Sequence, residues 1–465
     1  MGIIKDNGFS VKVIDNVVIH AQEPWTDHWL PLTNLDLLVP PFDVGSFFCY
    51  KKPSHGNFSD ILKSLKFSLS RALALYYPLA GEIKWNEAAG ENQFHCNNQG
   101  VDFTEAFADV ELKELNFYNP DESIEGKLIP KKLRGVLAIQ VTELKCGAIV
   151  IGSMFDHRSA DGYSANIFIS SWADITRLET PSMLPSFDRS ILGPRCPTTY
   201  SSSIDDIFTL FKPPTKPINN DKNHDDEGDD YKLVNRLFYI EGEQLQNLQL
   251  LASENGSRRS KLEAFTSFLW KIIALSMEES ENRNQICNLA VAVDGRSRIG
   301  QGDGEEKQKL LASLFGNVLS MPSGSKNVQE LKKMPLSDIA TEVHEFVQTA
   351  TRKDHFLDLI DWVDDRRKLP LVAKAFADNK EMAFMISSGQ RFQIMDMMDF
   401  GWGKVAFGSC YLPSGRQDCY VMTLPSPTNK NDWVVYMRLP LKHMNYIEKH
   451  ASQIFKPLNA DYLEI

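Results

Sequence analysis

The segment from position 148 to position 172 constrains the fold of this chain more than any other. Residues 148–151 read Ala-Ile-Val-Ile, a continuous apolar run that is typical of a strand buried on both faces. Polar residues occupy most of positions 156–161, Gly162 follows, and the apolar residues after it favour a buried or amphipathic helix. A buried strand, a polar loop and a helix in this order predict an α/β fold, in which ligands bind where such strands end.

The polar loop contains one histidine, His157, with Asp161 four residues further on. An imidazole has an ordinary pKa of about 6.5, so it can accept a proton near neutral pH. His157 is therefore a candidate general base. A histidine at the end of a strand is also often only a hydrogen-bonded structural residue, and the spacing His-x-x-x-Asp alone arises by chance. Other motifs have to decide between the two roles.

Two neighbouring elements can be predicted from their patterns. Residues 136–141 are apolar apart from Gln140 and predict a strand that pairs with the one before His157, across a turn at Cys146-Gly147. Residues 59–77 carry apolar side chains at helical spacing, with Ser59 as the candidate N-cap and Pro78 as the stop. We therefore expect a β-hairpin and a long amphipathic helix in the first half of the chain.

Four further blocks accompany the histidine loop. They read LSRAL and YYPLAG within residues 69–81, VDGRSR over 293–298, LFGN over 314–317 and DFGWG over 399–403. Their identity, order and separation resemble those of the plant BAHD acyl-CoA-dependent acyltransferases. The resemblance runs from about Trp29 to Trp433, so the sequence is identified as a member of this family.

The resemblance implies an α/β fold of two similar-sized domains. Each is expected to be a mixed β-sheet flanked by helices, as in chloramphenicol acetyltransferase, with a substrate tunnel at the interface. Between the halves, residues 213–230 are rich in proline and then in acidic residues and contain no Phe, Trp or Tyr, a composition that cannot bury enough apolar surface to fold. We predict an N-terminal domain at 1–194, an exposed crossover at 195–232 and a C-terminal domain at 233–465. An acidic interaction segment is the alternative interpretation of the crossover.

Composition and charge exclude several classes of function. The chain has 50 basic and 61 acidic residues and a net charge of -11, which argues against nucleic acid as a partner because phosphates bind basic surfaces. Seven cysteines without Cys-x-x-Cys pairs are typical of free thiols in a reducing compartment. The chain has no apolar run of spanning length and no signal-peptide pattern at its start, so we expect a cytoplasmic protein without membrane contact. The resemblance implies a monomer.

The resemblance also implies the reaction, which is transfer of an acyl group from a CoA thioester to an alcohol or amine, with acyl-CoA as co-substrate and no metal. A thioester is already activated, so the enzyme needs a base for the acceptor's proton rather than a nucleophile of its own. His157 matches the family's histidine and is the predicted general base, which typically contributes about 10²–10⁴-fold in rate. Asp161 matches an aspartate that points away from the substrate and pairs with Arg296 or Arg298.

Two further groups of residues have expected supporting roles. The resemblance implies that one block lies off the reaction centre and shapes the fold, namely Asp399, Phe400, Gly401, Trp402 and Gly403. Ser260 and Lys261 open a predicted helix, where a cation and backbone N–H groups suit a phosphate of CoA. A solvated basic turn is the alternative interpretation of Ser260 and Lys261.

A sequence difference from one subfamily narrows the range of expected acceptor substrates. Shikimate hydroxycinnamoyltransferases carry Thr-Ser-Trp where this chain has Ser388-Gly389-Gln390. Ser388 keeps a hydroxyl that can support the oxyanion, whereas the missing tryptophan argues against shikimate or quinate. Residues 34–38, 47–53 and 96–102 are similar to those of coniferyl alcohol acyltransferases, which implies acetyl-CoA as donor and a phenylpropanoid alcohol such as coniferyl alcohol as acceptor. A hydroxycinnamoyl or other acyl group and a different plant alcohol or amine are the alternative.

Three other functions compete with this prediction. Residues 162–166 resemble the nucleophile elbow of a serine hydrolase, but Asn166 replaces its second glycine. A metal site built on His157 and Asp161 lacks further ligands at a suitable spacing. Some relatives of this fold are accessory proteins in wax elongation. This chain retains His157, Asp161 and the DFGWG block, which favours an enzyme.

Overall fold

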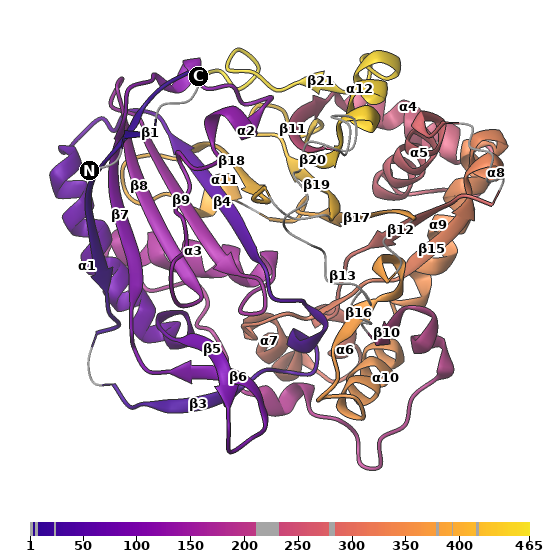
Figure 1. The fold of residues 1–465 in the computed structure, drawn as a ribbon, viewed down its shortest axis with the longest axis horizontal. Coiled ribbons are helices and arrows are strands. Elements are labelled where there is room, and N and C mark those ends of the chain that lie inside the picture. Colours follow the sequence, from indigo (N-terminus) through magenta and orange to yellow (C-terminus); the bar gives the residue numbers. More distant parts are fainter. Residues whose placement is uncertain are drawn as a thin grey trace, which may run out of the picture.

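The structure is a computed structural model that describes residues 3–4, 8–22, 25–210, 232–278, 284–377, 381–392, 394–414 and 418–465. Two large mixed β-sheets stand side by side, with helices around each of them (Figure 1). The predicted α/β fold with two mixed sheets flanked by helices is therefore confirmed.

The first sheet contains the strand that ends at the histidine loop. Its strand order is β1 (Ile3–Ile4), β2 (Val11–Ile19), β7 (Val101–Ala108), β8 (Leu137–Leu144), β9 (Ile149–Asp156), β4 (Asp43–Tyr50) and β18 (Val405–Tyr411). β7 and β8 run parallel, whereas the other neighbours in this order are antiparallel. All eight residues of β9 are buried, and β9 forms the predicted hairpin with β8.

The second sheet is built by the later part of the chain. Its strand order is β15 (Ser323–Asn327), β12 (Ile286–Val291), β17 (Met382–Ser388), β19 (Cys419–Pro425), β20 (Trp433–Pro440), β11 (Leu233–Ile240) and β21 (Lys456–Pro457). β12, β17 and β19 are parallel neighbours, while β19, β20 and β11 pair antiparallel. The ends of the parallel strands lie at the same edge of this sheet, which is the usual place for a ligand site.

One strand joins the two sheets. β18 pairs antiparallel with β4, with Cys410 opposite Ser46, at the edge of the first sheet. The chain reaches β18 from β17 and leaves it for β19, and both of those strands belong to the second sheet. A strand that follows position 233 in the sequence therefore completes the sheet that holds His157.

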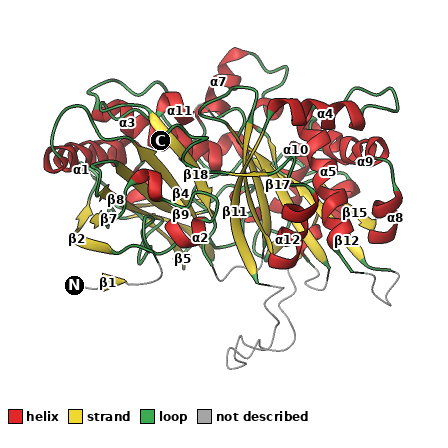
Figure 2. Cartoon of the chain, turned by 90° about the horizontal axis from the view of Figure 1, so that it is seen from above, coloured by secondary structure: helices red, strands yellow, loops and turns green. Residues whose placement is uncertain are grey.

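Helices pack against each sheet (Figure 2). α1 (Phe58–Leu75) and α3 (Gly162–Thr176) pack on each other beside the first sheet. Beside the second sheet, α5 (Lys261–Ser276) packs against α4 (Gly242–Ala252), α8 (Val328–Lys333), α9 (Leu336–Thr349) and α12 (Leu441–His450). The remaining α-helices of the described residues are α2 (Pro120–Ser123), α6 (Arg296–Ile299), α7 (Glu305–Ser313), α10 (Lys353–Asp364) and α11 (Ile394–Met397).

The cap of α1 differs from the prediction. The helix begins at Phe58, and the side chain of Asn57 accepts the N–H of Asp60. Ser59 was the wrong cap, because it lies inside the first turn. Asn and Ser are both favoured N-caps, so two cap-forming residues two positions apart cannot be ranked from the pattern alone.

Smaller sheets complete the described structure. They are β3 (His28–Pro31) with β6 (Glu91–Cys96) and β5 (Glu82–Asn86), β10 (Phe208–Leu210) with β16 (Leu371–Ala373), and β13 (Val293–Asp294) with β14 (Leu319–Ser320). Residues 211–231 of the predicted crossover lie outside the described residues. All seven cysteines are free thiols. Among the residues described, no helix combines the length and the apolar character needed to cross a membrane.

Candidate active site

His157 is the first residue after β9, and the fold holds its backbone in place. Its N–H donates to the carbonyl of Phe42 at 2.8 Å. Its ring lies edge-on to the ring of Phe42, with the centroids 4.9 Å apart. The side chain is half-buried. His157 is therefore partly accessible, with its Nδ1 buried and its main chain fixed.

The two neighbours of His157 bind each other. Asp156 accepts hydrogen bonds from the backbone N–H and the Nε of Arg158, both at 3.0 Å, and from its Nη2 at 2.6 Å. The Asp156 residue is buried, and Arg158 is largely so. Charge-assisted bonds of this kind are stronger than neutral ones, so this pair limits the conformations of the loop around His157.

Asp161 forms an ion pair with an arginine of the second half of the chain. Its Oδ2 lies 2.8 Å from Nη1 of Arg296, and the two side chains are 1% and 5% exposed. Its Oδ1 accepts the N–H of Ser164 at 2.8 Å and so caps α3. Of the two arginines left open by the sequence, Arg296 is the one that pairs with Asp161, while Arg298 lies half-buried two residues further along α6.

Arg296 gathers several groups around the start of α3. Its Nη2 donates to the hydroxyl of Ser164 at 2.9 Å and to the carbonyl of Gly316 at 3.0 Å. Burial alone would lower the pKa of Arg296, but the carboxylates of Asp161 and Asp294 raise it above its ordinary value. The guanidinium therefore stays charged and holds the loop after β9 against the second half of the chain.

Two contributors to this site had no predicted role. Asn317 donates a hydrogen bond to the backbone carbonyl of His157, and Asp36 accepts two hydrogen bonds from Asn317. Asn317 belongs to the LFGN block of the family resemblance, and Asp36 belongs to the segment 34–38 that is similar to coniferyl alcohol acyltransferases. Their joint presence was the available signal, but a contact between residues 281 positions apart has no local pattern.

Ser388 is the last residue of β17. Its hydroxyl accepts a hydrogen bond from Thr423 at 3.3 Å. A Cβ placed on Gly389 would lie 3.0 Å from the ring of Phe392, and a Cβ placed on Gly162 would lie 3.4 Å from the same ring. Phe392 thus connects the Ser388 stretch with the residue that follows Asp161, and the structure brings these predicted site segments together.

The DFGWG block forms a tight loop that supports the first sheet. The Asp399 carboxylate accepts hydrogen bonds from the N–H groups of Gly401 at 2.8 Å and Gly403 at 3.1 Å. The backbone carbonyl of Asp399 accepts a hydrogen bond from Arg177. Gly401 has a φ of 100°, a backbone conformation that favours glycine. The Phe400 ring is 2% exposed and lies edge-on to Trp172 of α3 at 4.9 Å.

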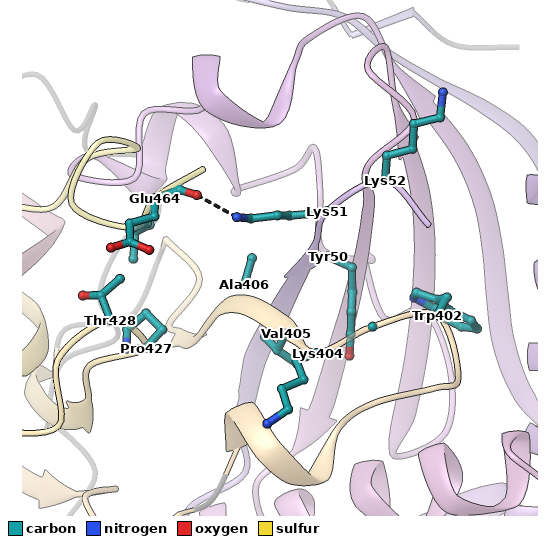
Figure 3. Close-up of a pocket in the computed structure, with 12 residues that line it drawn as sticks. Tyr50, Lys51, Lys52, Trp402, Lys404, Val405, Ala406, Pro427, Thr428 and Glu464 are labelled. Atoms are coloured by element: carbon teal, nitrogen blue, oxygen red, sulfur yellow. Dashed lines mark hydrogen bonds between the residues drawn. The ribbon is translucent and has the colours of Figure 1, made fainter. Parts of the chain in front are cut away.

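A pocket of about 370 Å³ lies beside this block (Figure 3). Its lining includes Tyr50, Lys51, Lys52, Trp402, Lys404 and Glu464. Lys51 donates to the backbone carbonyl of Glu464 at 2.7 Å, and Lys404 pairs with Asp396 at 2.8 Å. His157 is not among the residues that line this pocket, so the pocket is separate from the histidine loop.

Ser260 and Lys261 are located at the start of α5. The Ser260 hydroxyl donates to Glu263 at 2.7 Å and accepts the N–H of that residue at 3.2 Å, which is a capping box. Burial would raise the pKa of Glu263, but hydrogen bonds from Ser260 and His344 lower it below its ordinary value. Lys261 lines a pocket of about 610 Å³ with Glu241, Glu243 and Asp432. A negative carboxylate therefore already occupies the N-terminus of α5.

A model of the Transferase family matches residues 9–454. The chain belongs to this BAHD family. This BAHD member is 28% identical over 427 residues to shikimate O-hydroxycinnamoyltransferase of Nicotiana tabacum, which covers 90% of this chain and 93% of that protein. It is 27% identical over 461 residues to rosmarinate synthase of Plectranthus scutellarioides, and the alignment covers 96% of this chain and 100% of that protein. Family membership confirms the predicted enzyme class, an acyltransferase.

Solved structures of low identity share the BAHD member's fold. Vinorine synthase superposes with a TM-score of 0.69 at 20% identity and covers 96% of this chain and 99% of its own. TRI101 of F. graminearum, solved with coenzyme A and T-2 mycotoxin, superposes with a TM-score of 0.71 at 13% identity. The superposition covers 92% of this chain and 98% of the TRI101 chain. At these identities the likeness concerns the fold.

Proposed function

We propose that this BAHD acyltransferase uses His157 as the general base that deprotonates the acceptor hydroxyl. The position of His157 carries the proposal. Its imidazole is half-buried at the end of a fully buried strand, and the buried pair of Asp161 and Arg296 anchors the same loop. A partly accessible imidazole on a fixed backbone supports this role, which also requires hydrogen-bond reach to the acceptor hydroxyl.

The proposed reaction has two proton transfers. His157 takes the proton of the acceptor hydroxyl as its oxygen attacks the thioester carbonyl, and a tetrahedral oxyanion forms. The carbon–sulfur bond then breaks, the acyl carbonyl is restored, and the imidazolium returns the proton to the thiolate of CoA. Asp161 takes no proton in this scheme, because its oxygens already accept bonds from Arg296, Ser164 and Val318.

Ser388 is the proposed support for the oxyanion. Its hydroxyl oxygen accepts a bond from Thr423, so its own hydrogen can point toward the acyl oxygen. A donor placed where negative charge develops contributes most in the transition state. The connection through Phe392 to the residue after Asp161 supports the placement of Ser388 near the histidine loop.

The proposed substrates are acetyl-CoA and a phenylpropanoid alcohol such as coniferyl alcohol. The blocks at 34–38, 47–53 and 96–102 support this choice, as does the Ser388-Gly389-Gln390 triplet. The tobacco relative is named a hydroxycinnamoyltransferase of shikimate, so a hydroxycinnamoyl donor is the second candidate. A hydroxycinnamoyl donor and a different acceptor would leave the role of His157 unchanged.

We propose Lys261 as a contact to a phosphate of CoA. Lys261 lines the pocket beside the start of α5. A phosphate contact from Ser260 requires that its hydroxyl exchange Glu263 for the ligand, because the capping box now engages it. Arg259 turns inward and donates to Thr341 at 2.9 Å, so it supplies no charge to a ligand in this conformation.

We further propose a cytoplasmic monomer with domains at 1–194 and 233–465 joined by a crossover at 195–232. The seven free thiols support a reducing compartment. β18 lies in the first sheet, so neither domain would have its complete set of strands if the two were separated.

Release of free thiol by the purified protein tests the proposed function. Acetyl-, malonyl-, benzoyl- and coumaroyl-CoA are each crossed with coniferyl alcohol, shikimate, an anthocyanin and spermidine, and His157→Ala is run beside the wild type. Release from acetyl-CoA with coniferyl alcohol, lost in His157→Ala, is the expected result. Release with another pair only would overturn the substrates and keep the mechanism. CoA binding without release across the panel would favour an accessory protein.

A further inference from the structure

Asn317 connects the second half of the chain to the peptide of His157. Its side chain is fully buried, and its Nδ2 donates to the carbonyls of His157 at 3.0 Å and Arg158 at 3.2 Å. The same amide nitrogen lies 3.1 Å from Oδ1 of Asp36. All three partners are acceptors, so the NH₂ end of the amide has to face them.

Asp36 binds the same amide group of Asn317. The carboxylate is fully buried, and its Oδ1 also accepts the backbone N–H of Asn317 at 2.7 Å. Its Oδ2 accepts the N–H of Thr33 at 2.8 Å, and the Thr33 hydroxyl accepts the N–H of Asp36 at 3.0 Å. Asp36 is therefore held in its own turn and presents one oxygen to both N–H groups of Asn317.

The chain passes Asp36 too closely to allow much movement. Gly316 has a φ of 144°, and a Cβ there would lie 2.8 Å from Nη1 of Arg189 and 3.1 Å from Oδ1 of Asp36. On the other side of Asn317, the N–H of Val318 donates to Asp161 at 3.1 Å. Residues 316–318 are thus held between Asp36 and Asp161.

These contacts hold the backbone of His157 on both sides. Its N–H is bound to Phe42 at 2.8 Å and its carbonyl to Asn317 at 3.0 Å. A displacement of about 1 Å in a catalytic group can cost on the order of 10²-fold in rate. The peptide that carries the imidazole therefore depends on an amide that comes from the other half of the chain.

We propose that Asp36 and Asn317 are positioning residues for His157. Asp36 orients the Asn317 amide, and Asn317 fixes the carbonyls of His157 and Arg158. The proposal rests on His157 being the general base, and neither side chain contacts the reacting atoms. Loss of the hydrogen bonds made by Asp36 and Asn317 should lower kcat and leave the affinity for CoA unchanged.

The test compares Asn317→Ala, Asp36→Asn and the double variant in the full-length protein, with the acyl-CoA and acceptor pair that gives most thiol release. We expect kcat of Asn317→Ala to fall by on the order of 10²-fold, with Kd for free CoA unchanged by calorimetry. Asp36→Asn keeps the shape of the side chain and should lower kcat less. The double variant should be no worse than Asn317→Ala, because the two residues act through one bond network.

Two controls separate positioning from a loss of stability. Asn288 is also a buried asparagine, with bonds to Glu381 at 2.9 Å and Ser325 at 2.6 Å in the second sheet, so Asn288→Ala should lower Tm without changing kcat of the folded protein. If Asn317→Ala does not fold, Asp36→Asn alone decides the outcome. A kcat equal to wild type in the folded Asn317 or Asp36 variant would overturn the positioning role of the two residues. Full activity of His157→Ala would instead overturn the role of His157 as the general base, on which the positioning role rests.

Discussion

Asp161 and Arg296 form a buried ion pair with 2.8 Å between Oδ2 and Nη1, and their side chains are 1% and 5% exposed. The same carboxylate caps α3 through the N–H of Ser164 and binds the N–H of Val318. The pair thus joins the loop after β9 to the second half of the chain. Both oxygens of Asp161 therefore accept hydrogen bonds from Arg296, Ser164 and Val318.

Asp161→Ala should fail as a folding defect. Removing one partner of a buried pair leaves an uncompensated charge and costs roughly 3–5 kcal/mol. Urea unfolding measures this loss. The matched control is Lys63→Gln, which breaks an exposed pair with Asp60 at 3.2 Å and should change stability by less than about 1 kcal/mol. Wild-type stability of Asp161→Ala together with abolished turnover would show a chemical role instead.

The two arginines of the VDGRSR block should differ sharply. Arg296→Met removes the partner of Asp161 and should destabilise by roughly 3–5 kcal/mol. Arg298→Met changes a half-buried side chain outside that pair and should cost less than about 1 kcal/mol. Thermal melting of the two variants side by side gives the comparison. Equal losses would mean that both arginines support the loop.

Stability should fall between neutral pH and moderately acidic pH because two histidines are buried. Burial lowers the pKa of His355 and of His443 to about 4, whereas the unfolded chain titrates near 6.5. Protonation therefore favours the unfolded chain, and the stability present above about pH 6.5 is lost as pH falls toward 4, at up to ~1.4 kcal/mol per pH unit for each histidine.

Urea unfolding of His443→Gln measures this effect. Between about pH 6 and about pH 5, the unfolding free energy of the variant should depend less steeply on pH than that of the wild type, by the contribution of one histidine. His55→Gln, at an exposed position, is the control and should keep the wild-type slope. An unchanged slope in His443→Gln would contradict the assignment.

The DFGWG block should respond as a structural loop. Asp399→Ala removes the acceptor of two backbone N–H groups and should cost about 1–3 kcal/mol. Asp399→Asn retains an accepting oxygen and should recover most of that stability. In both variants kcat of the folded protein should stay near wild type. A stable but inactive Asp399→Asn would instead place the carboxylate in the reaction.

The parts of this fold that local pattern determines were predictable. The apolar run before His157 became β9, and the turn at Cys146-Gly147 joins the predicted hairpin. The edge strand β18 was not identified, because a strand's own residues do not show which sheet it joins. The identity of the Asp161 partner was open for a similar reason, since Arg296 and Arg298 have the same chemistry and only the path of α6 decides between them.

Asp36 and Asn317 show the same limit at the site. The sequence places them in recognisable blocks, but they are separated by 281 positions and meet only when the two halves of the chain pack together. His157 could be assigned a role from resemblance because one residue carries that chemistry. A positioning network of backbone carbonyls and amides leaves no comparable pattern in the sequence.

The steady-state kcat of His157→Ala, with Kd for CoA determined on the same preparation, tests the general-base role of His157. We expect kcat to fall by about 10²–10⁴-fold, with CoA affinity and Tm unchanged, because His157 is half-buried and its backbone bonds survive the substitution. A kcat within threefold of wild type in a folded, CoA-binding His157→Ala would contradict the assignment of His157 as the general base.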